Sequence, residues 1–304
     1  MTMVIPTGVL SLDIALGIGG LPCGHLIEIF GPEGSGKTTL CLHTVTEAQK
    51  LGGTVAYLDM DQALDPAYAA RLGADIENLL VTNVEDPAEA MDIVGRLTRS
   101  RAVDIIVVDS MAAMVERAGI GQSAAGSGGV TFSRWLAPAL RRLAGTAQQS
   151  GATVIFVNEQ RQRGGWMYGV TQSTPGGMGL KVNAAIRIEI HGVGVLHSGN
   201  EVVGMRTRAQ VVKNKLAKPL RATEFNIMYN GGVARLNDLC DLAIEFGLIK
   251  THGRHYTYGD IDLGQGRQQA CASLSQNVAL ADELEINIRT QCELYSPTLV
   301  EDEP

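Results

Sequence analysis

The chain has 304 residues, of which 45% are hydrophobic and 19% charged, with 36 glycines. This length fits one large domain or a core with a small satellite, and the composition excludes a disordered, collagen-like or coiled-coil chain. Apolar runs are shorter than the roughly 18 residues of a membrane span, so we expect a cytoplasmic protein with no membrane partner. The five cysteines lie far apart without a CxxC pair, which favours reduced thiols over a disulfide framework or structural zinc.

The net charge of −7 is unevenly distributed along the chain. Residues 259–304 hold nine acids and two bases, so the first 258 residues are neutral, with 23 of each. Between Val195 and Arg221, six bases face one acid. The overall charge argues against an indiscriminate nucleic-acid binder, whereas the local basic stripe is suited to phosphate contacts. A solvated face is the alternative interpretation of either charge run.

Short apolar runs alternate with helix-compatible stretches through the first half of the chain. The predicted strands are 26–30, 54–58, 103–108 and 153–157, and the predicted helices are 38–50, 86–99 and 134–149. Nearly continuous apolar strands separated by helices predict a parallel sheet covered on both faces. Ligands of such sheets bind at the carboxyl ends of the strands, so functional residues are expected there.

The second half of the chain shows strand-like alternation over 184–191, 208–213 and 223–229, a helix over 237–246, and a small unit from about Leu248. Two glycine-rich segments, about 119–129 and 160–179, interrupt the regular pattern. Long flexible loops inside a compact domain are usually functional, because only a bound partner offsets the entropy lost on ordering them. Slack surface loops are the alternative.

A glycine-rich turn after the first long predicted strand matches the phosphate-binding pattern GxxxxGK[ST]. The turn consists of Gly31, Pro32, Glu33, Gly34, Ser35, Gly36, Lys37, Thr38 and Thr39. Its position between a strand and a helix makes the match specific. Glycines allow backbone N–H groups to surround phosphate oxygens, Lys37 would reach the β- and γ-phosphates, and Thr38 would bind Mg²⁺. Nucleotide binding is the strongest prediction from the sequence.

Acidic residues follow two other predicted strands. Asp109 ends the strand 103–108, where a second carboxylate can hold Mg²⁺ through water; capping of the next turn is the alternative. Asp59 and Asp61 follow the strand that ends at Leu58, and with regular alternation both point the same way. Either could orient an attacking water, and periodicity does not choose between them.

Several stretches closely resemble the RecA recombinases of bacteria and their phage relatives. They are Thr7 to Gly17, Gly31 to Thr39, Ala63 to Pro66 with Tyr68, Val107 to Ser110, and Val211 to Lys215. The resemblance runs from Pro6 to about Tyr295 and implies an α/β fold: a P-loop ATPase core (1–235) with a mostly parallel central sheet covered by helices, and a small α/β C-terminal domain (236–304) with a short acidic tail.

The resemblance implies ATP and Mg²⁺ as cofactors and assigns roles within the nucleotide site. Lys37, Thr38 and Asp109 take the phosphate and metal roles, and Asp65 with Tyr68 falls where the family contacts adenine. Lys213 and Lys215 match lysines that reach the γ-phosphate held by a neighbouring subunit, and therefore count as catalytic beside Lys37 and Asp61.

The two glycine-rich segments fall where the family has its DNA-binding loops. The candidate DNA-binding residues are Arg134, Arg141, Arg161, Arg163, Trp166, Tyr168, Gly176 and Gly177. Arginines and glycine backbones suit phosphates, and Trp166 or Tyr168 suits a base. An aromatic side chain packed against the base of its own loop is the alternative for Trp166.

Four departures from the family pattern bear on function. Asp61 replaces the water-activating Glu and is shorter by one methylene, which predicts slower hydrolysis. Glu159 replaces the γ-phosphate-sensing Gln, so either Gln160 serves as the sensor or the coupling to DNA is altered. The first loop lacks charges and a bulky apolar wedge. The chain begins where the ATPase core of the family begins, so weaker filaments are expected unless the start codon is misassigned.

The leading hypothesis is an ATP-dependent recombinase that forms helical filaments on single-stranded DNA and pairs it with homologous duplex in repair of DNA damage and the SOS response. The second is a slowly hydrolysing accessory or regulatory paralogue that does not form filaments by itself. A DNA-independent ATPase is disfavoured by the second loop and by Lys213-Asn214-Lys215. Further candidate partners are a repressor and a full-length recombinase.

Overall fold

A large mixed sheet forms the centre of the protein. The computed structural model describes residues 3–118, 127–165, 169–295, 297 and 299. For residues 127–134, 161–165 and 169–173 it describes the backbone alone. Among the described residues the sheet has nine strands in the order β13-β12-β11-β10-β3-β7-β6-β4-β5. The segment from β10 to β5 is parallel, and β11, β12 and β13 extend it with antiparallel pairs. The strands are β3 (Leu26–Gly31), β4 (Val55–Asp59), β5 (Leu79–Thr82), β6 (Ile105–Asp109), β7 (Thr153–Glu159), β10 (Ile186–Ser198), β11 (Glu201–Asn214), β12 (Ala222–Met228) and β13 (Gly232–Val233).

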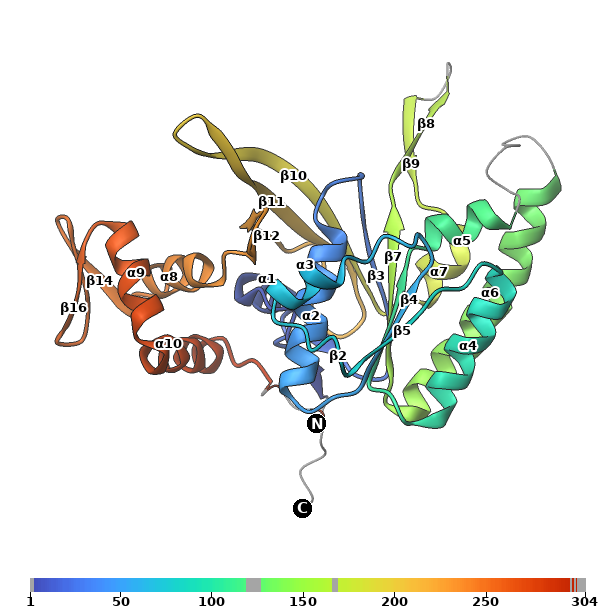
Figure 1. Cartoon of the computed structure of the whole chain (residues 1–304), viewed down its shortest axis with the longest axis horizontal. Helices are drawn as coiled ribbons and strands as arrows, with labels where there is room; N and C mark the ends of the chain where they lie inside the picture. The colour runs from blue at the N-terminus through green and yellow to red at the C-terminus, as the bar shows by residue number, and fades with distance from the viewer. Residues whose placement is uncertain (1–2, 119–126, 166–168, 296, 298, 300–304) are drawn as a thin grey trace.

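Helices cover both faces of this sheet because its parallel strands are apolar on both sides (Figure 1). On one face, Ile27 and Ile29 of β3 pack in one apolar cluster with Leu40 of α2. On the other face, Leu26 packs in a second cluster with Leu140 of α6. The first face carries α1 (Leu10–Leu16), α2 (Lys37–Lys50) and α3 (Pro66–Arg71); the second carries α4 (Pro87–Ser100), α5 (Met111–Arg117), α6 (Ser127–Ser150) and α7 (Gly177–Asn183). A short pair, β1 (Val4–Ile5) and β2 (Leu21–Pro22), adds to the first layer.

The C-terminal part of the chain forms a small α/β unit beside the sheet (Figure 1). It consists of α8 (Arg235–Glu245), the antiparallel strands β14 (Ile249–His252), β15 (His255–Tyr258) and β16 (Ile261–Gln265), and the helices α9 (Arg267–Gln276) and α10 (Val278–Gln291). The unit has its own apolar cluster, which Leu10 of α1 joins. Arg289 Nη2 donates to Asp13 Oδ2 over 2.8 Å and so ties α10 to α1. The expected fold class is therefore confirmed.

The glycine-rich segment 160–179 differs from the open loop expected from sequence. Residues 160–179 contain the antiparallel hairpin of β8 (Arg161–Gly165) and β9 (Gly169–Ser173), followed by the start of α7. Residues 127–129 belong to α6, and 119–126 lie outside the described part of the chain. Cross-strand backbone hydrogen bonds hold a hairpin whatever its side chains, so a glycine-rich sequence gives little sign of it. Within the described residues, no helix is long and apolar enough to cross a membrane.

Candidate functional site

The phosphate-binding turn connects β3 to α2 at the carboxyl edge of the sheet, as the motif predicts. Gly36 has φ +93°, a left-handed conformation that favours glycine, and a Cβ there would lie 2.4 Å from Ile227 Cδ1. Lys37 is buried, and its Nζ donates to the carbonyl oxygens of Gly31 at 3.2 Å and Pro32 at 2.7 Å. Burial lowers the pKa of Lys37, and the nearby Glu159 carboxylate opposes this shift. The ammonium group is thus held at the turn.

Thr38 of α2 and Asp109 of β6 meet at the carboxyl edge of the sheet. Thr38 Oγ1 donates to Asp109 Oδ2 over 2.7 Å, and Tyr57 Oη of β4 donates to the same oxygen over 2.7 Å. Burial raises the pKa of Asp109, and the two hydrogen bonds oppose that shift. Sequence reasoning missed Tyr57. The signal for it was its position two residues before Asp59 in a buried strand, which places both side chains on the same side of the strand.

The turn and the Thr38–Asp109 pair have the donor set that a triphosphate with a divalent cation needs. The buried Ser35 hydroxyl has no hydrogen-bond partner among the described residues, so it can donate to a bound oxygen. Hydroxyl and carboxylate oxygens are the ligands that Mg²⁺ prefers in such sites. The residues present therefore fit Mg²⁺ and phosphate.

The structure separates the two acids that follow β4. Asp59 is buried, and its carboxylate accepts from the backbone N–H groups of Ala63 at 3.1 Å and Leu64 at 2.9 Å. Asp59 therefore holds the loop that leaves the strand. Asp61 is exposed, and its charge contributes to the raised pKa of Asp109, so it lies at the same edge of the sheet. Of the two acids, Asp61 is accessible to an attacking water.

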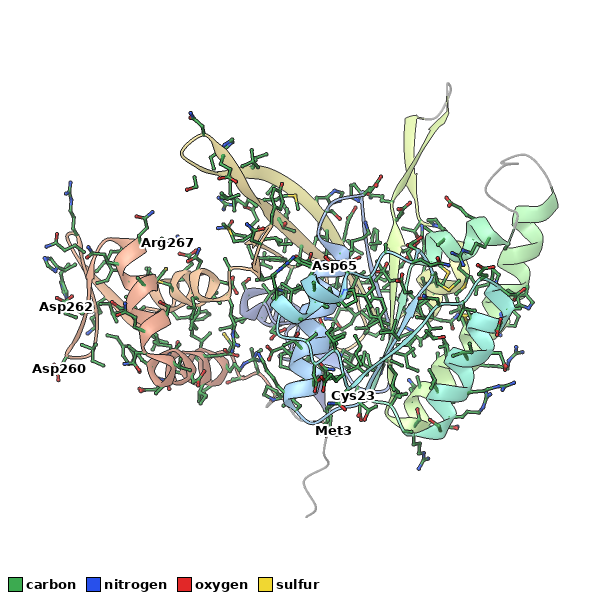
Figure 2. All side chains as sticks on the ribbon, viewed as in Figure 1. Met3, Cys23, Asp65, Asp260, Asp262 and Arg267 are labelled. Carbon is green, nitrogen blue, oxygen red and sulfur yellow. The ribbon has the colours of Figure 1, made fainter. Side chains whose placement is uncertain are left out.

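A cavity of about 270 Å³ extends from the phosphate turn. Tyr68 of α3 lines this cavity, and its hydroxyl shares a 3.1 Å hydrogen bond with Thr39 Oγ1. The Arg71 guanidinium carbon lies 5.6 Å from the centre of the Tyr68 ring. Tyr229, which is 52% exposed directly after β12, lines the same cavity and was missed from the sequence. Asp65 caps α3 by accepting from Ala67 N over 2.8 Å. It begins the helix that carries Tyr68 (Figure 2).

The two lysines at the end of β11 have different surroundings. Lys213 Nζ donates to the carbonyl oxygens of Lys181 at 2.6 Å and Val182 at 2.9 Å, in the last turn of α7. Burial lowers the pKa of Lys213 to about 8. Lys215 is exposed. Within this chain, therefore, Lys213 binds the end of α7 while Lys215 faces the surroundings.

The end of β7 lies directly beside the phosphate turn. Glu159 pairs with Gly31 across the β3–β7 ladder, and Gln160 N donates to Gly31 O over 3.0 Å. Gln160 Nε2 donates to Glu189 Oε1 of β10 over 2.6 Å. The chain then continues from Gln160 into the β8–β9 hairpin. The phosphate turn and the hairpin thus share one backbone junction.

The buried residue Asn158 of β7 ties the segment that follows the hairpin to the sheet. Asn158 Nδ2 donates to Glu28 Oε1 of β3 over 2.8 Å and to Pro175 O over 2.9 Å. Glu28 is fully buried and also accepts from Arg187 of β10. Pro175 directly precedes Gly176 and α7, so both ends of the 160–175 segment are held close to β7. Asn158 and Glu28 were not recognised from the sequence.

Six of the eight candidate DNA-binding residues lie on α6, on β8 and at the start of α7. Arg161 and Arg163 lie on the backbone of β8, and Arg134 lies in α6, while Trp166 and Tyr168 fall outside the described residues. Arg141 of α6 is exposed and lines a cavity of about 660 Å³ between α4 and α6. Gly176 and Gly177 begin α7 beside β9. That these residues lie along one path of bound DNA stays a prediction.

The geometry defines a class of protein. The site combines a glycine-rich turn between β3 and α2 with the buried Lys37 and with Asp109, which accepts a hydrogen bond from Thr38. This combination is the site of a P-loop nucleotide-binding protein.

Comparisons with known proteins identify the family. Residues 2–234 match the RecA N-terminal domain and residues 237–293 the RecA C-terminal domain. The chain is 49% identical over 286 residues to Protein RecA of Caldanaerobacter subterraneus subsp. tengcongensis, covering 94% of this chain and 84% of the relative. It is 47% identical over 286 residues to Protein RecA of a Roseiflexus species, with 94% and 81% covered. It is 45% identical over 297 residues to Protein RecA of Clostridium perfringens, with 98% and 84% covered.

The chain therefore belongs to the RecA family, and the resemblance inferred from its motifs is confirmed. Similarity that extends through both family domains supports the recombinase and does not favour the accessory paralogue.

Proposed function

We propose that the protein is a DNA-dependent ATPase that forms filaments on single-stranded DNA and pairs that strand with homologous duplex. The observation that carries the proposal is the junction of Gly31 with Glu159 and Gln160, which joins the phosphate turn to the β8–β9 hairpin. A change in the turn when ATP binds or is hydrolysed would be transmitted through this shared backbone to the hairpin. Nucleotide state and DNA binding would then be coupled.

Within the nucleotide site, each side chain has a distinct proposed role. Lys37 moves from the carbonyl oxygens of the turn to the phosphates, and Ser35 donates to a phosphate oxygen. Thr38 and Asp109 would hold Mg²⁺. Mg²⁺, when bound, neutralises charge on the phosphates. Asp61 orients the attacking water and accepts its proton, and its short side chain makes this step slow.

The base of the nucleotide would occupy the cavity that Tyr68 and Tyr229 line. Aromatic faces stack on a purine, and Asp65 supports this contact by fixing the start of α3. Lys215, together with Lys213 at the end of α7, would reach the γ-phosphate held by the next subunit of a head-to-tail filament. Positive charge arriving from a neighbour stabilises the transferred phosphoryl group, so hydrolysis would depend on assembly.

The DNA would follow the hairpin and the helices α6 and α7. Arg161, Arg163, Arg134 and Arg141 are proposed to contact phosphates, and Trp166 or Tyr168 a base. Base pairing between the bound strand and the duplex, rather than side chains, would supply sequence specificity. A repressor and a full-length recombinase stay proposed partners of such a filament.

A homologous-pairing assay tests the proposal. The purified protein, a labelled single strand, supercoiled duplex, ATP and Mg²⁺ are expected to give a joint molecule only when the sequences are homologous. Lys37→Ala, which removes the phosphate contact, is expected to abolish the product. Joint molecules that form equally without ATP, or no joint molecules despite DNA binding and hydrolysis, would contradict the recombinase function.

A further inference from the structure

Two cysteines of the C-terminal unit lie together, away from the nucleotide site. Cys240 of α8 is fully buried, and Cys271 of α9 is partly exposed. Both belong to the apolar cluster in which α8 packs against α9, and their thiols lie close enough for each to influence the pKa of the other. Both thiols are free in the structure. Neighbouring helices thus present two sulfur atoms to each other.

An ion pair stands next to these thiols. Arg267 donates through Nε and Nη2 to both carboxylate oxygens of Asp241, over 2.6 and 2.7 Å. Arg267 lies one helical turn before Cys271, at the exposed beginning of α9 (Figure 2), and Asp241 directly follows Cys240. The guanidinium favours a thiolate on Cys271, whereas the Asp241 carboxylate disfavours it.

The two thiols differ in exposure, which assigns their roles: Cys271 is partly exposed and within reach of an oxidant, whereas Cys240 is fully buried behind it. Interaction with the Cys240 thiol and the charge of Arg267 lower the pKa of Cys271. Interaction with Cys271 and burial raise the pKa of Cys240. A thiolate that is partly exposed and beside a second thiol is the arrangement in which oxidation proceeds to a disulfide.

We propose that Cys271 and Cys240 form a peroxide-sensitive thiol pair, in which Cys271 is the attacking and Cys240 the resolving residue, and that oxidation links α8 to α9 by a disulfide. In the first step the Cys271 thiolate attacks one oxygen of hydrogen peroxide, the O–O bond breaks, and hydroxide leaves and takes up a proton to become water. Cys271 is then a sulfenic acid. In the second step Cys240 sulfur attacks Cys271 sulfur, and the hydroxyl leaves as water with the Cys240 proton. Two thiols are oxidised, and one peroxide is reduced to two waters.

The test treats the full chain with hydrogen peroxide at pH 7 and follows each cysteine by differential alkylation and mass spectrometry. The intact mass is expected to fall by two hydrogen atoms, with peptides of Cys240 and Cys271 linked and the link removed by dithiothreitol. Cys292, at the end of α10, is the internal control, since it is partly exposed but burial raises its pKa. Its oxidation is expected to be at least about tenfold slower, given the smaller thiolate fraction.

Two variants separate the roles of the thiols. Cys240→Ser is expected to leave Cys271 as a sulfenic acid that dimedone traps, and Cys271→Ser to abolish the mass loss while Cys240 stays reduced. Because Cys240 is buried and its replacement can disturb the fold, Cys271→Ser at the partly exposed position keeps the test independent of folding. Cys292→Ser should behave as the wild type. Equal oxidation of Cys271 and Cys292, or a sulfenic acid on wild-type Cys271 without a disulfide, would overturn the proposal.

Discussion

Thr38 Oγ1 donates to Asp109 Oδ2 over 2.7 Å, and so the first turn of α2 is joined to the end of β6 across the edge of the sheet. The contact brings together residues 71 positions apart in the chain. Tyr57 Oη donates to the same oxygen, so both hydrogen bonds fall on Asp109 Oδ2. Thr38 and Asp109 are thus already positioned to hold a cation between their side chains.

Replacing Asp109 by Asn is expected to reduce Mg²⁺-dependent ATP hydrolysis by about two to three orders of magnitude, because an amide holds the cation and its water less well than a carboxylate. Steady-state hydrolysis across a Mg²⁺ titration measures this. Asp92→Asn is the matched control, since Asp92 is exposed on α4 in an i,i+4 pair with Arg96. Unchanged activity of Asp109→Asn would remove Asp109 from the metal site.

Replacing Asp61 by Asn is expected to lower the hydrolysis rate, whereas replacing Asp59 by Asn is expected to lower the stability of the fold. Asp61→Asn should lower turnover by about 10²-fold or more with little change in stability, because it removes a general base from an exposed position. Asp59→Asn should cost about 1–3 kcal/mol of folding free energy, because the buried carboxylate accepts from two backbone N–H groups of the loop and an amide offers only one acceptor oxygen.

Thermal unfolding and hydrolysis rates, measured on both variants, separate these roles. Asp61→Glu restores the missing methylene and is expected to raise turnover above that of the wild type. If Asp61→Asn hydrolyses ATP as fast as the wild type, Asp61 is not the base.

Hydrolysis stimulated by DNA is expected to fall as the pH rises through about 8. The pKa of Lys213 is lowered to about 8 by burial, so its ammonium is charged below that pH and neutral above it. If its charge acts on the neighbour's γ-phosphate, the rate should drop about tenfold between pH 7 and pH 9. The stability contribution has the opposite sign: folding releases a proton between pH 8 and 10.5, so stability rises with pH there.

Lys213→Arg keeps its charge throughout this range and should flatten the pH profile. Lys218→Arg, in the exposed part of the same basic stretch, should retain the decline. A profile that is the same in the wild type and in Lys213→Arg would show that Lys213 does not set it.

Asn158→Ala is expected to destabilise the fold by about 1–3 kcal/mol, since Glu28 Oε1 loses a donor inside the protein and the tether to Pro175 is lost. Denaturant unfolding measures the free energy. Asn183→Ala, which removes a single bond to the Gly179 carbonyl within α7, is the matched control and should cost less. DNA stimulation of hydrolysis should fall more than the basal rate, whereas an equal loss of both would argue against a coupling role.

The regular part of the fold could be predicted from the sequence because its signals are local. Leu26–Gly31 and Ile105–Asp109 are buried on both faces, so each appears in the sequence as a continuous apolar run. The phosphate turn was predictable for the same reason, since its residue spacing and its place between a strand and a helix specify it. Its motif needs no partner from elsewhere in the chain.

What could not be predicted depends on contacts between distant segments. Tyr57 looks like an ordinary buried strand residue until β6 brings Asp109 beside it. Asp59 and Asp61 share a face by alternation, and only the path of the loop after β4 turns one toward backbone N–H groups. Tyr229 becomes part of the nucleotide cavity because β12 ends above Gly36, more than 190 positions away in the chain.

The most direct test of the account is the ATP hydrolysis rate of the purified chain with and without single-stranded DNA, with DNA binding followed on the same sample. The account predicts clear stimulation by DNA that Lys37→Ala abolishes, because nucleotide site and hairpin share the junction at Gly31 and Gln160. Binding of DNA without any change in the hydrolysis rate would contradict it.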